Sequence, residues 1–346
     1  MKKWLSALLV LVLLLVLGIA CVHAETRTFI DSTGREVVID EKIERIAVTG
    51  PLAQIMVFAI APDELVALAN EWNEGSENYI AEKYMDLPLL GQLYGGKGQM
   101  NLEELLAAAP QVVIDVGRPV EGVKEDMDAL TEQTGIPFVH IAATMEAMDQ
   151  TYEMLGELLD KPEEAAALSD YCRSAYDRAK AVANSVDKTR ILYMPAITGF
   201  SVLAKGSYHS EVIDMMGDNL AVVDNPSSKG TGNEVSMEQV MLWNPDVVIF
   251  GESGGYEEAM GDPLWQTVSA GQNGKLYQAP FGVNNWMGNP PSVQRLLGML
   301  WMSKLLYPEA ADYDMYEEAA QYYKLFYHCD LTQEMYDALV ARSLGK

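Results

Sequence analysis

Short runs of apolar, often β-branched residues alternate with amphipathic stretches along most of the chain. Residues 28–40 alternate polar and apolar positions around a Ser-Thr-Gly turn, which predicts a β-hairpin. Strand patterns follow at 45–49, 65–69, 112–116, 137–141, 190–194, 246–250 and 276–279. Helical patterns occur at 52–60, 122–134, 145–160, 292–306, 315–326 and 332–343. Strands that alternate with helices indicate an α/β fold with mostly parallel sheets and helices on both faces.

One pattern occurs twice. Residues 101–114 and 236–249 each begin with a helix N-cap residue, followed by a glutamate two positions later, a short amphipathic helix, a proline and a β-branched strand. The two glutamates, Glu103 and Glu238, stand 135 residues apart (238 − 103). A solenoid repeat is much shorter, about 20–50 residues. We interpret the copies as parts of two similar α/β lobes, between which a cleft would hold a small ligand.

A long helix is predicted between the two copies. Residues 163–186 contain neither glycine nor proline, and apolar residues recur there every three to four positions. Pro162 suits the first turn of such a helix. At about 36 Å it would reach from one lobe to the other. The expected organisation is a segment 1–24, an N-terminal Rossmann-like lobe 25–161, a single linker helix 162–186 and a C-terminal Rossmann-like lobe 187–346.

The first 24 residues have the features of a secretion signal. Two lysines precede an apolar run, 5–20, and the small-residue motif at 22–24 would leave Glu25 as the first residue. Residues 18–21 also resemble a lipoprotein cleavage motif, although glycine stands where leucine is usual. The sequence therefore predicts an exported protein, either periplasmic or anchored by a lipid on Cys21 at the outer face of the membrane.

The composition is that of an acidic globular protein. Of the 346 residues, 50 are Asp or Glu and 24 are Lys or Arg, which gives a formal net charge of −26. This charge repels polyanions, so we expect neither nucleic acid nor an anionic membrane surface as a partner. We expect a monomer. In an oxidising compartment, Cys172 and Cys329 could either form a disulfide or stay free.

These features, in this order, resemble the substrate-binding proteins of bacterial ABC importers for iron–siderophore complexes, haem and cobalamin. The resemblance is carried by residues 31–39 and 45–48, both glutamate-bearing patterns, the long helix and residues 286–301, and it covers essentially all of the chain after residue 24. It implies two α/β lobes joined by one rigid helix, and a permease dimer with its ATPase subunits as partner. It also implies that Glu103 and Glu238 meet arginines of the permease. Each glutamate would in addition complement a helix dipole, for about 0.3–1 kcal/mol.

Candidate ligand-binding residues follow the predicted strands, because ligands of parallel α/β sheets bind beyond the carboxyl ends of the strands. They are Trp72, Tyr94, Arg118, Phe200, His209, Phe281, Asn285 and Trp286. This aromatic and amide-rich set favours a bulky metal chelate over a bare ion. Arg118 could pair with an anionic group of the ligand. The structural alternatives are a surface salt bridge for Arg118 and core positions for Trp72 and Trp286.

Tyr94 and His209 are the candidate metal ligands, and an axial tyrosine or histidine would favour haem. Each also has a structural interpretation, as a loop tyrosine packed on its own lobe and as a residue at the start of a helix. The sequence shows no cluster of histidines and carboxylates, which disfavours a receptor for free metal ions.

Two motifs of common enzyme classes are missing. Residues 91–98 lack the Ser or Thr of a phosphate loop, and the sequence contains no HExxH motif. We therefore expect a receptor rather than an enzyme, without a resident cofactor, and with an iron–siderophore complex as the first hypothesis for its ligand. Haem or cobalamin is the alternative within the family, and an exported enzyme on a similar scaffold is the alternative outside it.

Overall fold

The structure, a computed structural model, describes residues 25–94, 99–196, 200–251, 253–288 and 290–344. The predicted signal segment and Cys21 lie outside the described residues. Within the described ranges, none of the helices combines the length and apolar character that a membrane crossing needs.

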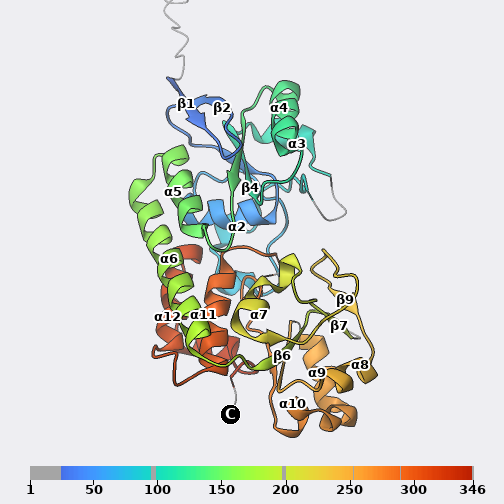
Figure 1. The fold of residues 1–346 in the computed structure, drawn as a ribbon. Coiled ribbons are helices and arrows are strands. Elements are labelled where there is room, and N and C mark those ends of the chain that lie inside the picture. The colour runs from blue at the N-terminus through green and yellow to red at the C-terminus, as the bar shows by residue number, and fades with distance from the viewer. Residues whose placement is uncertain (1–24, 95–98, 197–199, 252, 289, 345–346) are drawn as a thin grey trace, which may run out of the picture.

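The N-terminal half is built on a three-stranded parallel sheet (Figure 1). The strand order is β3–β4–β5, with bounds Ile46–Val48, Val112–Gly117 and Phe138–Ala142. The predicted hairpin is present as β1 and β2, which are antiparallel and span Thr26–Ile30 and Glu36–Asp40. The prediction of a strand at 65–69 is wrong, because no continuous strand forms there. Leu65 and Leu68 each form only an isolated bridge, to Ile46 and to Leu89.

The C-terminal half repeats this arrangement with a four-stranded parallel sheet. The strand order is β11–β10–β6–β8, with bounds Leu276–Gln278, Val247–Phe250, Arg190–Met194 and Asp218–Asn219. A small antiparallel pair lies beside it, formed by β7 at Ser201–Val202 and β9 at Asn233–Glu234. The sequence did not predict β7, β8 or β9, because two residues are too few to show a period.

Helices cover the sheets and join the halves. Their bounds are α2 Pro51–Ile60, α3 Leu102–Ala108, α4 Val123–Thr134, α5 Met148–Leu159, α6 Pro162–Ser185, α7 Glu211–Met216, α8 Met237–Trp243, α9 Ser253–Gly261, α10 Ser269–Gln272, α11 Gln294–Leu306, α12 Met315–Tyr327 and α13 Gln333–Leu339; single 3₁₀ turns lie at Ser76–Asn78, Glu82–Tyr84, Tyr208–Ser210 and Pro263–Thr267. The sequence missed α9, whose first turn contains two glycines. Gly255 is needed there, because a Cβ atom would lie 2.7 Å from the carbonyl oxygen of Ala196.

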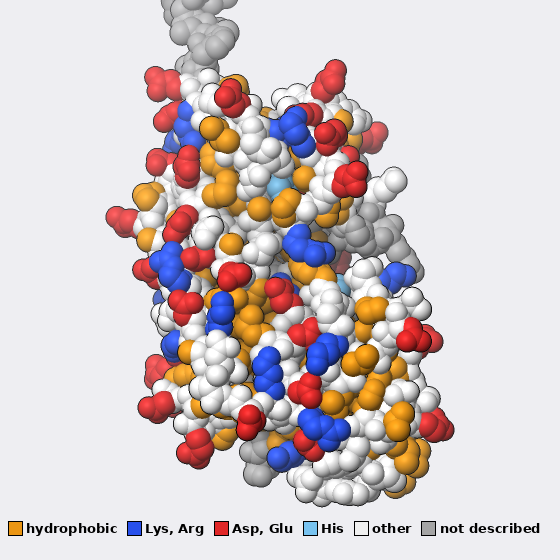
Figure 2. Space-filling model, viewed as in Figure 1, with side chains coloured by type: hydrophobic (Ala, Val, Ile, Leu, Met, Phe, Trp, Pro, Cys, Tyr) orange, Lys and Arg blue, Asp and Glu red, His pale blue; other side chains and the backbone are white. Residues whose placement is uncertain are grey.

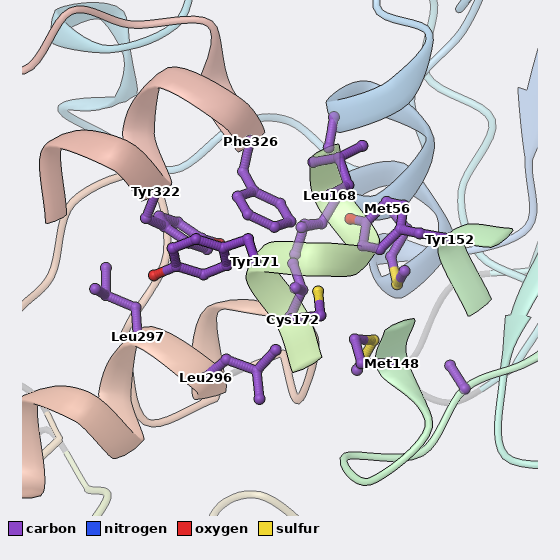
Figure 3. Close-up of a cluster of buried hydrophobic side chains, with 14 of the residues drawn as sticks. Met56, Met148, Tyr152, Leu168, Tyr171, Cys172, Leu296, Leu297, Tyr322 and Phe326 are labelled. Atoms are coloured by element: carbon purple, nitrogen blue, oxygen red, sulfur yellow. The ribbon is translucent and has the colours of Figure 1, made fainter. Parts of the chain in front are cut away.

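Helix α6 runs along both halves (Figure 1) and has the bounds expected of the linker within one residue. It contacts α2 and α5 of the first half and α7, α11 and α12 of the second. Figure 3 shows the resulting core, in which Tyr152 of α5, Tyr171 of α6 and Phe326 of α12 meet. Arg178 of α6 also makes two parallel hydrogen bonds to Glu318 of α12, one of them 2.7 Å long.

The fold class is therefore confirmed: two α/β halves with parallel central sheets are joined by one long helix. The lobe boundaries 25–161, 162–186 and 187–346 stay a prediction. The two cysteines do not form a disulfide, because Cys172 is buried in α6 as a free thiol and Cys329 is a free, half-buried thiol after α12.

Candidate ligand-binding cleft

Arg118 lies where the two halves meet. It follows β4 at the carboxyl end of the N-terminal sheet, and its guanidinium carbon lies 3.8 Å from the centroid of the Tyr208 ring in the C-terminal half. A hollow of about 400 Å³ opens beside this contact and is lined by Arg118, Thr144, Gly206, Ser207, Tyr208, Glu211 and Asp214. In Figure 2, basic side chains and a histidine lie at the level where the upper and lower halves join. The expected cleft between the lobes thus has lining residues from both.

Arg295 approaches the same tyrosine from the C-terminal half. This residue lies in the first turn of α11, is only 2% exposed, and has its guanidinium carbon 5.5 Å from the Tyr208 ring centroid. Its Nη1 is 3.1 Å from Oε2 of Glu211, in ion-pair contact but without hydrogen-bond alignment. Its Nε has no hydrogen-bond partner among the described residues. A buried guanidinium with unused N–H groups is costly, so this site favours an added acceptor.

Gly288 makes room for that arginine. Its φ is +98°, in the region that favours glycine, and a Cβ atom there would lie 2.4 Å from Cδ of Arg295. Close to these two residues in the chain, Ser292 Oγ and Gln294 Oε1 are buried without a hydrogen-bond partner in the described part of the protein. Ser207 Oγ, in the residue before Tyr208, is also buried without a hydrogen-bond partner among the described residues. These buried polar groups therefore have hydrogen-bonding capacity to spare.

His209 is half-buried beside Tyr208, with ring centroids 5.2 Å apart. Burial lowers the pKa of His209 below its usual 6.5, and the positive charges of Arg295 and Arg118 lower it further. The imidazole is therefore neutral at pH 7, and a neutral ring can donate one hydrogen bond and accept another. His209 also lines a second hollow of about 10 Å³, room for about one water molecule.

Tyr94 is poorly suited to ligate iron. Its hydroxyl donates a 2.8 Å hydrogen bond to Oδ2 of Asp126. Burial raises the pKa of Tyr94, and the bond to Asp126 raises it further, whereas a phenolate ligand requires a lowered pKa. Among the described residues, no group of three or more His, Cys, Asp and Glu side chains could hold a metal ion. Iron ligation by Tyr94 or His209 stays a prediction that no contact supports.

The two candidate tryptophans are held by contacts within the protein. The indole Nε1 of Trp72 donates to the carbonyl of Tyr84 at 3.0 Å, and its ring packs edge-on against Phe58. Trp286 is only 1% exposed and belongs to the large core. These positions match the structural alternative for both residues, and ligand contact by either one stays a prediction.

The other three candidates, Asn285, Phe281 and Phe200, also make contacts within the protein. Asn285 lines the small hollow, but its amide donates to the carbonyl of Gly251 and its Oδ1 accepts from the backbone N–H of Met287. Asn285 therefore fixes the loop after β11 against the end of β10. Phe281 forms a backbone bridge with Asn285, and Phe200 packs towards Trp265 of the C-terminal half. Their ligand roles also stay predictions.

The sequence reasoning missed Tyr208 and Arg295. A signal for the arginine was present, because residues 296–302 are all apolar and Arg295 is the only charged residue of α11 before Lys304. A charge inside such a helix is a candidate functional group, since a buried charge needs a partner. Tyr208 gave no comparable signal, because its role depends on two arginines that lie 177 residues apart (295 − 118).

A buried polar row crosses the N-terminal sheet near the cleft. Thr49 Oγ1 donates to Oδ1 of Asp115, and Nδ1 of His140 lies 2.6 Å from Oδ2 of the same carboxylate. This row resembles an acid–base array, but His140 is 1% exposed and Asp115 is 5% exposed. Its contacts join the end of β3 to β4 and β5, so the row serves to hold three parallel strands together.

The two repeated glutamates occupy equivalent positions. Both are exposed in the first turn of a short helix, Glu103 in α3 and Glu238 in α8. The N-caps are as predicted, because the side chain of Asn101 accepts hydrogen bonds from Glu103 and Glu104, and that of Ser236 accepts one from Gln239. Hydrogen bonding to Ser236 lowers the pKa of Glu238, which is therefore ionised at pH 7.

Comparison with known proteins agrees with this architecture. The chain matches the family described as periplasmic binding protein over residues 62–282. No curated protein matches it. An ABC transporter solute-binding protein from Sulfurospirillum deleyianum superposes with a TM-score of 0.82, 27% identity, and coverage of 91% of this chain and 99% of the other. A periplasmic solute-binding protein from Veillonella parvula superposes with a TM-score of 0.74 and 26% identity over 92% of this chain and 98% of the other.

A third solved structure is the molybdate periplasmic binding protein MolA of Haemophilus influenzae, bound to molybdate. It superposes with a TM-score of 0.68 and 21% identity over 88% of this chain and 99% of the other, a likeness that shows the fold alone. The matched family covers residues 62–282, more than half of the chain, and includes β4, α6, Tyr208 and the loop after β11. The chain therefore belongs to the periplasmic binding protein family and has the fold of ABC-transporter solute-binding proteins.

Proposed function

We propose that this protein is the substrate-binding component of an ABC importer and that its ligand is an anionic metal chelate of the iron–siderophore class. The observation that carries the proposal is the convergence of Arg118 and Arg295 on Tyr208 at the junction of the two halves. Binding is reversible and involves no chemistry on the ligand. The protein then delivers the ligand to a permease dimer that works with ATPase subunits.

The guanidiniums of the cleft support an anionic ligand. Arg118 and Arg295 both lie near Tyr208, and of the two carboxylates that line the hollow, Glu211 and Asp214, Glu211 is in ion-pair contact with Arg295. A guanidinium binds planar or paired oxygens through two N–H groups. The unused N–H of Arg295 and the hydroxyl of Ser207 would complete such a site.

Haem or cobalamin is the alternative ligand within the family. The contacts favour it less, because the phenol of Tyr94 is committed to Asp126 and its pKa is raised. His209 remains the one neutral imidazole beside the described cleft, and it would be the axial ligand if the cargo were haem.

The ligand class is tested by fluorescence titration. The purified protein is titrated with ferric catecholate and ferric hydroxamate siderophores, haem, cobalamin and a nickel–histidine chelate, with an inner-filter control for each absorbing ligand. Saturable quenching by an anionic ferric chelate supports the proposal. Saturation by haem or cobalamin alone favours the alternative. Silence across the panel, confirmed by calorimetry, contradicts a receptor for these chelates and favours the exported-enzyme alternative.

Docking to the permease is proposed to use Glu103 and Glu238. Both carboxylates are exposed and stand on equivalent helices of the two halves. A double variant, E103Q/E238Q, is expected to bind the ligand as the wild type does but to support much less uptake by cells. Loss of ligand binding in this variant would contradict a docking role.

Export is proposed from the N-terminal segment and the family. Intact-mass measurement of the protein from the cell envelope separates the two routes. A mass that starts at Glu25 indicates a periplasmic protein, and a diacylglycerol-modified Cys21 indicates a lipid-anchored one. A mass that includes residue 2 contradicts processing by either route.

A further inference from the structure

Two short helices expose aliphatic side chains directly beside the repeated glutamates. On α3, Leu106 is 51% exposed and lies three residues after Glu103. On α8, Met241 is 42% exposed and Leu242 is 78% exposed, three and four residues after Glu238. Residues three or four positions apart on a helix are neighbours on its surface. Each helix therefore presents one carboxylate and an adjoining aliphatic patch.

The two patches are equivalent in the internal repeat. Adding 135 to the number of a residue in α3 gives its counterpart in α8, so that Glu103 corresponds to Glu238 and Leu106 to Met241. The counterparts Leu105 and Val240 are both buried. The structure also ends both helices in the same way, at Ala109 and Asn244, each with a φ of +45°. Because the two helices share this geometry, side chains at equivalent positions point outward in both halves.

A single exposed leucine is ordinary on a protein surface and needs no explanation. Leu106 and Met241 differ because they recur at matching positions, each beside an exposed carboxylate, and Leu242 extends the second patch. In Figure 1, α3 and α8 both lie on the side of the molecule away from α6. A partner that meets both helices must therefore present the same feature twice.

We infer that Leu106 on one side, and Met241 with Leu242 on the other, are docking contacts that each bind an apolar side chain beside a cationic residue of the partner. The inference rests on the proposed function, because the occupant is the two-fold permease dimer of the importer. The carboxylates supply attraction and orientation, and the aliphatic groups supply affinity that does not depend on salt. Apolar cover around a charge pair also excludes water from it.

The test measures binding of the protein to its purified permease–ATPase complex in lipid nanodiscs. The protein is produced with its own N-terminal segment, so that it is processed as in the cell. Three variants are compared with the wild type: L106S, M241S/L242S and the combination of all three. The control is I30S/V38S on the β1–β2 hairpin, where two aliphatic side chains are as exposed as those on α3 and α8. Each measurement is made at about 0.15 M and about 0.5 M salt.

We expect L106S and M241S/L242S each to weaken binding about tenfold and the combination to weaken it further, with the same factors at both salt concentrations. The control should bind as the wild type does. Stimulation of ATP hydrolysis should fall in parallel, while thermal unfolding midpoints stay unchanged, because all three side chains are on the surface.

The outcomes separate this inference from the proposed function. If E103Q/E238Q abolishes binding while the triple serine variant binds within about twofold of the wild type, the aliphatic contacts are refuted and the importer role stands. If the wild-type protein itself fails to bind the complex, both are refuted. Sedimentation of the wild type as a dimer that the serine substitutions dissociate would assign these patches to a second copy of the chain and overturn the inference.

Discussion

The guanidinium of Arg118 lies 3.8 Å from the centre of the Tyr208 ring and thereby joins the carboxyl end of the N-terminal sheet to the C-terminal half. The guanidinium of Arg295 lies 5.5 Å from the same ring. Two like charges are thus held near one another by an aromatic face between the two halves. The arrangement favours an anion, because both guanidiniums carry N–H groups that an anionic oxygen can accept from.

The first prediction concerns the aromatic ring of Tyr208. Replacing Tyr208 with Leu removes the face that orients both guanidiniums, and cation–π contacts of this kind are worth about 0.5–2 kcal/mol each. Affinity for a ferric tricatecholate, measured by fluorescence quenching, should fall about threefold to thirtyfold. Tyr208→Phe keeps the ring and should stay close to the wild type. Equal losses in both variants would show that the hydroxyl, and not the ring, matters.

The second prediction concerns pH and His209. The folded protein holds the pKa of His209 below its usual 6.5, through burial and the charges of two arginines. As the pH falls, the unfolded chain therefore takes up a proton on His209 before the folded protein does. The contribution of the neutral imidazole to the free energy of unfolding is complete above the usual pKa of 6.5 and is lost as the pH falls towards the lowered pKa of the folded protein. Urea unfolding at about pH 7.5 and about pH 5 should show a smaller pH-dependent loss for His209→Gln than for the wild type. Identical pH dependence in both would contradict a lowered pKa.

The third prediction concerns Gly288. Alanine at this position would be strained by a φ of +98° and would place Cβ 2.4 Å from Cδ of Arg295. Gly34 is the matched control, because its φ is +79° but a Cβ atom added there would have no neighbouring atom within 4 Å. Gly34→Ala should cost about 1–2 kcal/mol of unfolding free energy. Gly288→Ala should cost about 1–3 kcal/mol more, because Arg295 must move. Ligand affinity should fall only in the second variant, and an equal effect of both would refute the steric role.

The fourth prediction concerns the attachment of α6 to α12. The Arg178–Glu318 pair is bidentate, and the carboxylate is only 11% exposed. Glu318→Gln should lower the unfolding free energy by about 1–3 kcal/mol, between the values for surface and fully buried pairs. The control is Glu44→Gln, which breaks the exposed pair of Lys42 and Glu44 and should cost less than about 0.5 kcal/mol. Chemical denaturation measures both, and equal costs would contradict a structural role for the α6–α12 pair.

Much of the fold could be predicted because it depends on patterns that are local in sequence. The absence of glycine and proline from 163–186 predicts α6, and the repeated N-cap, glutamate and proline predict α3 with β4 and α8 with β10. Elements such as β8 and α9 escaped prediction, because the first is two residues long and the second begins with glycines that the neighbouring loop requires.

The site was harder to predict than the fold. Arg118 and His209 were identified because they follow or precede regular elements, and the structure places both near Tyr208. Trp286 was chosen for the same reason, yet its side chain faces the core, since a strand end does not determine which way a loop side chain points. Arg295 became visible only through its burial and its contact with Glu211, which are tertiary properties.

The central claim is that the cleft binds an anion through Arg118 and Arg295. It is tested most directly by calorimetric titration of the wild type and of Arg118→Ala with two ferric chelates of similar size, an anionic tricatecholate and a neutral trihydroxamate. Our account predicts saturable binding of the anionic chelate, a loss of about tenfold to one hundredfold in Arg118→Ala, and much weaker binding of the neutral chelate. Equal affinity for both chelates, or an affinity for the anionic chelate that Arg118→Ala leaves unchanged, would contradict it.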